Sequence, residues 1–148
     1  MIDQKMIDKL TLYAKNGGNL VLSCRSGIQN RQGHLWEAKF YEPMWNLIGS
    51  QIESYDLLMP QSPGIIKFNN QEFGWTSWGD LLKPNKETEI WGTYDGDFYS
   101  GTPAIISHNL GKGTVTYIGV DSKNGDLEKQ VLRPVSYTHL TLPTNREV

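Results

Sequence analysis

Cys24 is the side chain in this sequence best suited to nucleophilic chemistry, and it is the only cysteine. It follows an apolar run at 19–23, so its thiol is expected at the end of a buried strand. A nucleophile at such a place usually has flanking glycines and a histidine as its base. Here the flanking residues are serine and arginine, and the candidate bases are His34 and His108. Because buried cysteines more often pack as small apolar side chains, the sequence favours a structural role for Cys24.

Asp95 and Asp97 lie in a segment rich in aromatic residues, 91–99 (WGTYDGDFY), whose composition is typical of a sugar-binding loop. Two carboxylates could also form the acid pair of a glycosidase. Such a pair needs carboxyl groups roughly 5 to 9 Å apart on rigid supports across a groove. A loop with a glycine between the two aspartates provides neither, so a solvated turn is the favoured interpretation.

The segment 111–113 (GKG) contains the residue types of a phosphate-binding loop. The P-loop, however, has a longer spacing between its glycines and ends in Lys-Ser/Thr before a helix. Here the segment precedes an apparent strand. The sequence therefore predicts a tight connecting turn.

Five tryptophans are many for 148 residues. Exposed indoles would suit a binding site or a subunit interface, whereas buried indoles would belong to the core. Both roles remain open for each of them. Trp36, Trp75 and Trp78 lie in loop-like surroundings, and the others are Trp45 and Trp91.

Composition excludes several classes of function. With 14 basic and 16 acidic residues the formal charge is −2, so we expect neither nucleic acid nor an anionic membrane surface as a partner. The longest apolar runs fall far short of the roughly 20 residues that span a bilayer. One cysteine permits neither an internal disulfide nor a zinc site built on paired thiolates. The chain is also too short for a (β/α)₈ barrel, which needs about 250 residues.

The first half of the chain is predicted to open with an αβ unit. Apolar residues at helical spacing predict a helix over 2–16, the pair Gly17-Gly18 ends it, and 19–24 is a buried strand. A short helix is predicted at 41–48 and a strand at 51–58. The segment 64–75 is predicted to form a β-hairpin around Asn69-Asn70, as an excursion from a parallel core.

The second half is predicted to be mainly strands. One helical turn is expected at 78–82, before Pro84. Strands are expected at 89–94, 102–108 and 114–119, and a helix begins at 126–132.

Residues 135–148 match no periodic pattern and resemble the translation of a sequencing adapter. One reading frame of a transposon mosaic end reproduces Val135 to Thr144 without a mismatch. We therefore expect a non-native, disordered tail at 135–148 and exclude it, including His139, from the functional argument. The natural domain is expected to be 1–134 and to continue beyond it.

An ordered set of segments resembles the middle domain of glycoside hydrolase family 42, the β-galactosidases. They are 10–22 (LTLYAKNGGNLVL), 25–27 (RSG), 47–49 (LIG), 53–56 (ESYD), 78–82 (WGDLL), Tyr94, 98–104 (FYSGTPA), 111–113 (GKG) and 117–119 (YIG). The resemblance covers about residues 3–133.

The resemblance implies an α/β fold: the C-terminal portion of a flavodoxin-like, class I glutamine amidotransferase-like three-layer domain. It implies a non-catalytic domain that assembles a homotrimer beside a barrel that binds β-galactosides. That barrel carries both catalytic glutamates, so no catalytic, cofactor-binding or metal-ligating residue is assigned to this chain, and no cofactor is expected. The domain would lack its first βα units, so the isolated chain is expected to be unstable or to aggregate.

Two alternatives are of other functional classes. In one, the tryptophan-rich loops make the chain a carbohydrate-binding module. In the other, the chain is a stand-alone amidotransferase-like protein that uses Cys24. The sequence leaves the cellular location undecided, with the cytoplasm favoured.

Overall fold

The computed structural model describes residues 4–24, 42–59, 61–96, 99–122 and 125–132. Their elements, in chain order, are α1 (Gln4–Lys15), β1 (Asn19–Ser23), the 3₁₀ helix η1 (Glu42–Met44), α2 (Trp45–Ile48), β2 (Ser50–Asp56), β3 (Gly64–Phe68), β4 (Gln71–Pro84), β5 (Glu89–Asp95), β6 (Pro103–Leu110), β7 (Gly113–Ile118) and β8 (Val120–Ser122). A further helix occupies 126–132.

The described strands form one mixed sheet of eight strands in the order β1-β7-β6-β5-β3-β4-β2, with β8 paired to β4. β1 and β7 are parallel, as the αβ unit predicts, and the other pairs are antiparallel. The β3–β4 hairpin is confirmed, with left-handed backbone at Asn69 and Asn70. The hairpin is part of the main sheet and not an excursion from a parallel core. Among the described strands, only β1 and β7 form a parallel pair.

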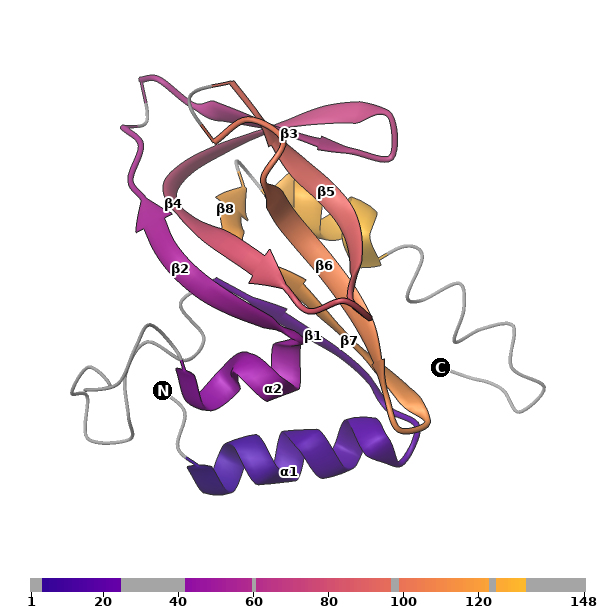
Figure 1. The fold of residues 1–148 in the computed structure, drawn as a ribbon. Coiled ribbons are helices and arrows are strands. Elements are labelled where there is room, and N and C mark those ends of the chain that lie inside the picture. Colours follow the sequence, from indigo (N-terminus) through magenta and orange to yellow (C-terminus); the bar gives the residue numbers. More distant parts are fainter. Residues whose placement is uncertain (1–3, 25–41, 60, 97–98, 123–124, 133–148) are drawn as a thin grey trace.

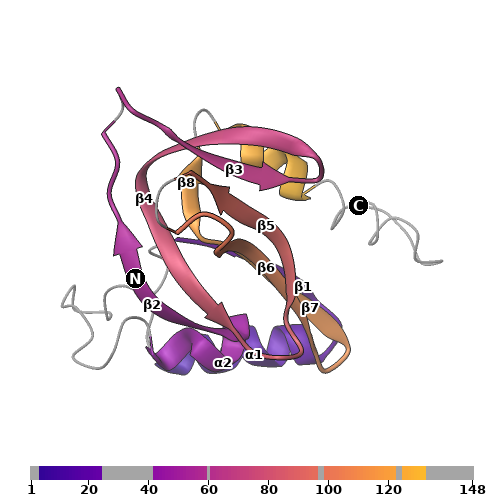
Figure 2. The same cartoon turned by 45° about the horizontal axis from the view of Figure 1, so that its top comes forward.

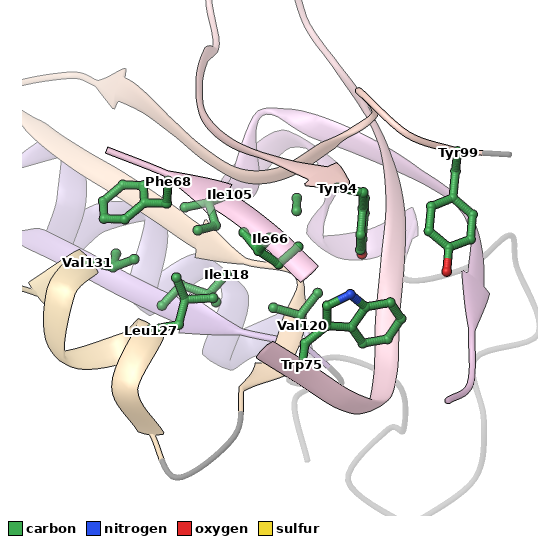
Figure 3. Packing of buried hydrophobic residues seen from close by; sticks show 11 residues of the cluster. Ile66, Phe68, Trp75, Tyr94, Tyr99, Ile105, Ile118, Val120, Leu127 and Val131 are labelled. Atoms are coloured by element: carbon green, nitrogen blue, oxygen red, sulfur yellow. The ribbon is translucent and has the colours of Figure 1, made fainter. Parts of the chain in front are cut away.

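Helices cover both faces of the sheet, which gives three layers (Figures 1 and 2). On one face α1 and α2 pack over a core cluster that includes Ile7, Leu47 and Tyr117. On the other face the helix at 126–132 contributes Leu127 and Val131 to a second core cluster (Figure 3). Because alternate residues of β7 face the two clusters, every residue of this strand except Thr114 is buried.

The predicted helical turn at 78–82 is wrong. These residues belong to β4, which pairs with β3 through its first half and with β2 through its second half. A bulge around Ser77, whose φ is 74°, redirects the strand between the two partners. A single helical turn has little stability by itself. As part of a strand, this segment instead pairs with two neighbouring strands. Figure 1 shows the resulting long arch of β4.

Candidate functional site

Cys24 lies just beyond β1 and is buried. Its Sγ donates a hydrogen bond to Oδ1 of Asp121 at 3.3 Å. His108 lies elsewhere, because it pairs with Val115 on β7 while the end of β1 pairs with Ile118 on the opposite side of that strand. The Nε2 atom of His108 is 2.7 Å from the carbonyl oxygen of Leu47. The geometry thus separates Cys24 from His108, and His34 lies outside the described residues.

A buried aspartate on β4 forms the most highly connected polar cluster. Asp80 is fully buried, and its carboxylate accepts hydrogen bonds from Trp78 Nε1 at 2.7 Å and from the Tyr117 hydroxyl at 2.5 Å. Its backbone N–H donates to the carbonyl of Gly119 at 2.7 Å. We call this group, with Tyr94, the Asp80 cluster. It ties β4 to β7 near the carboxyl ends of the parallel pair.

Tyr94 on β5 completes the cluster from the other face of β4. Its hydroxyl donates to the carbonyl oxygen of Asp80 at 2.6 Å. Burial, followed by the nearby charge of Asp80, raises the pKa of Tyr94 well above its ordinary value. The phenol therefore remains protonated and acts as a hydrogen-bond donor. Figure 3 shows its ring beside Trp75 and Tyr99 in the second core cluster.

The sequence analysis did not select Asp80. The signal available was an acidic residue inside the apolar segment 78–82 (WGDLL), where an unpaired charge would be costly. Trp78 is only two positions away, but Tyr117 is 37 positions away, so the sequence does not reveal this second partner. Within the described residues, the hydrogen bonds of the cluster join β4 to β5 and β7, so its role there is structural.

The four described tryptophans lie in the core or pack against it. Trp75 is buried, and Trp45 and Trp78 pack at the margin of the first core cluster. Trp91 stacks against Phe68 with ring centroids 6.5 Å apart. Trp36 lies outside the described residues.

The remaining candidate residues lie at strand ends and in a turn. Asp95 ends β5 and approaches Lys67 with a separation of 3.7 Å between Oδ2 and Nζ, while Asp97 lies outside the described residues. The segment 111–113 is a turn, as predicted. Its Lys112 N–H donates to the carbonyl of Lys15, so the turn is fastened to the end of α1.

Three exposed apolar side chains lie close together in the sequence at the end of β2, where Tyr55 adjoins the Asp80 cluster. Tyr55, Leu57 and Met59 are 37%, 60% and 69% exposed. The ring of Tyr55 stacks on Trp78, with centroids 4.2 Å apart and planes 7° apart. Sequence reasoning included Tyr55 and Leu57 in a strand but did not predict that they face outward.

Metal binding and membrane spanning find no support in the described part of the chain. No group of three or more His, Cys, Asp or Glu side chains there could hold a metal ion. None of the helices described is long and apolar enough to cross a membrane.

Comparison with known proteins identifies relatives along the whole chain. A family model described as the beta-galactosidase trimerisation domain matches residues 1–140. Beta-galactosidase LacA of Lactobacillus acidophilus is 29% identical over 147 residues, which are 99% of this chain and 21% of that protein. Beta-galactosidase BgaB of a Geobacillus species is 27% identical over 119 residues, which are 80% of this chain and 18% of that protein.

Solved structures share the fold. A polyextremophilic beta-galactosidase from Halorubrum lacusprofundi matches with a TM-score of 0.81 at 23% identity, over 91% of this chain and 20% of that one. A beta-galactosidase from Bacillus circulans matches with a TM-score of 0.79 at 19% identity, over 93% of this chain and 22% of that one. The chain thus spans about a fifth of the length of the relatives it matches.

Proposed function

Because the chain belongs to the β-galactosidase trimerisation domain family, we propose that it is the non-catalytic assembly domain of a β-galactosidase. The observation that carries this proposal is the family match across residues 1–140. The parent enzyme would remove terminal non-reducing β-D-galactose residues from β-galactosides with retention of configuration. Its two catalytic glutamates would lie outside this chain, on a barrel that binds the substrate.

The site geometry agrees with a domain that does no chemistry of its own. The carboxylate of Asp80 is occupied by two donors within the protein, and the phenol of Tyr94 is held protonated. Cys24 donates to Asp121 and lies apart from His108. These contacts stabilise the sheet, and self-association is the function that remains for its surface. In the proposed assembly, three copies of the parent chain meet through this domain.

We also propose that the native part of the chain ends at residue 134. Residues 1–134 would form part of the domain, and 135–148 would derive from the adapter. Resequencing the source DNA across this region should replace the codons from Val135 onward with ordinary coding sequence. The same tail found intact in the genome would remove the adapter interpretation and leave the family membership unchanged.

Hydrolysis of a chromogenic β-galactoside tests the proposed activity. The full-length protein that contains this chain should release galactose, and proton NMR should detect the β-anomer first, because a retaining glycosidase passes through a covalent intermediate. The 148-residue chain assayed under the same conditions should release none. Hydrolysis by the 148-residue chain alone would contradict the proposal. A full-length protein that does not hydrolyse the substrate would contradict it as well.

A further inference from the structure

The segment from Tyr55 to Met59 carries three exposed apolar side chains at alternate positions. β2 ends at Asp56, and residues 57–59 follow it without regular secondary structure. Tyr55, Leu57 and Met59 point outward and are 37%, 60% and 69% exposed. Asp56 and Leu58 between them are partly buried. We call Tyr55, Leu57 and Met59 the apolar ladder.

The inward-facing residues hold the ladder in place. The Asp56 carboxylate accepts a hydrogen bond from the Tyr99 hydroxyl at 2.5 Å and another from the backbone N–H of Leu57 at 2.9 Å. The carbonyl of Leu58 accepts a bond from the N–H of Ser77 at 3.0 Å, and its side chain packs against the second core cluster. The segment is therefore fixed on the domain while its outer side chains remain exposed.

The aromatic end of the ladder is equally well supported. The ring of Tyr55 lies flat on Trp78, and the indole of Trp78 donates to the buried carboxylate of Asp80. A binding surface that is already ordered loses little conformational entropy on association. The ladder thus has the rigidity expected of an interface anchor.

The position of the apolar ladder favours association of the chain with another protein surface. It continues from β2, which pairs only with β4 among the described strands. Large apolar side chains beside an open strand edge promote association unless they are covered. Leu, Met and aromatic side chains without charged neighbours in the line are typical of an interface core.

We infer that the apolar ladder is a contact surface for a second copy of this chain. This inference rests on the proposed function, because a family of trimerisation domains supplies a copy of the same chain as the partner. Each copy would cover the ladder of its neighbour or offer its own ladder to another surface of that neighbour. The Asp80 cluster then has a role in assembly, since it supports the Trp78 indole on which Tyr55 rests.

Leu12 provides a matched control. It lies on α1, and its side chain is 60% exposed, the same value as for Leu57. Its neighbours one turn away are polar and exposed: Asp8, Lys9, Lys15 and Asn16. An exposed leucine whose neighbours one turn away are charged or polar is ordinary surface.

Sedimentation equilibrium of the full-length protein tests the inference with Leu57→Asp, Met59→Lys and Leu12→Asp. A charge placed in a buried interface should raise the dissociation constant of the assembly by about 100-fold or more for Leu57→Asp and Met59→Lys. Leu12→Asp should leave it unchanged. Thermal unfolding measured by circular dichroism should find all three variants folded.

The remaining outcomes separate the two claims. If the wild-type protein sediments as a single chain, the proposed function fails and the inference fails with it. If the wild type is oligomeric and both ladder variants keep its affinity, the inference alone is overturned. If all three variants dissociate, the ladder has no special role and the inference is also overturned. If both ladder variants unfold while Leu12→Asp stays folded, the ladder packs against another part of its own protein, which overturns the inference as well.

Discussion

Replacing Asp80 by alanine in the full-length protein is expected to lower the free energy of unfolding of this domain by about 3 to 5 kcal/mol. The substitution removes the acceptor of two donors, the buried hydroxyl of Tyr117 and the indole N–H of Trp78. A buried donor that loses its acceptor retains the cost of its desolvation. The loss is measured by urea unfolding followed through tryptophan fluorescence.

Two further variants test whether the loss of stability comes from the hydrogen bonds of the Asp80 carboxylate. Asp80→Asn keeps one acceptor oxygen, so its loss should be smaller than that of Asp80→Ala. Asp95→Ala removes an exposed aspartate whose carboxylate lies 3.7 Å from Lys67, and it should cost about 1 kcal/mol or less. Equal losses for Asp80→Ala and Asp95→Ala would refute the fastening role of Asp80.

Gly113→Ala is expected to destabilise the domain by about 3 kcal/mol. A Cβ at this position would lie 2.1 Å from the carbonyl oxygen of Gly18 and 2.2 Å from that of Ala14. Both atoms belong to the backbone, so α1 must move away from β7 to make room. Thermal unfolding of the full-length protein measures the effect.

Gly74→Ala is the matched control for this substitution. The nearest atom to a Cβ there is the carbonyl oxygen of Gly64 at 3.9 Å, an ordinary contact. We expect the free energy of unfolding to rise or fall by no more than about 1 kcal/mol. A similar melting temperature for the two alanine variants would mean that α1 does not pack against the turn as closely as described.

Local signals in the sequence were sufficient for several elements. The helix α1 follows from helical spacing and its Gly17-Gly18 end, and the β3–β4 hairpin follows from Asn69-Asn70. Each signal depends on residues close together in the chain, and each is confirmed.

Features that depend on distant partners were missed. The segment 78–82 has no local strand signature and becomes a strand because β2 and β8 lie beside β4. A bulge between Ile52 and Ser54 shifts the alternation of β2, so Tyr55 lies opposite Asp80 and stacks on Trp78. The hydrogen bonds of Asp80 likewise join strands that only the fold brings together. Periodicity cannot predict such contacts, since it contains no information about which strands become neighbours.

The native mass of the full-length protein tests the central claim most directly. If this chain is an assembly domain, sedimentation equilibrium at micromolar concentration should give three times the mass of one full-length chain. The mass should remain unchanged on moderate dilution, because an assembly domain is expected to bind its copies tightly. A mass equal to that of one chain would contradict the claim that this domain holds the enzyme together.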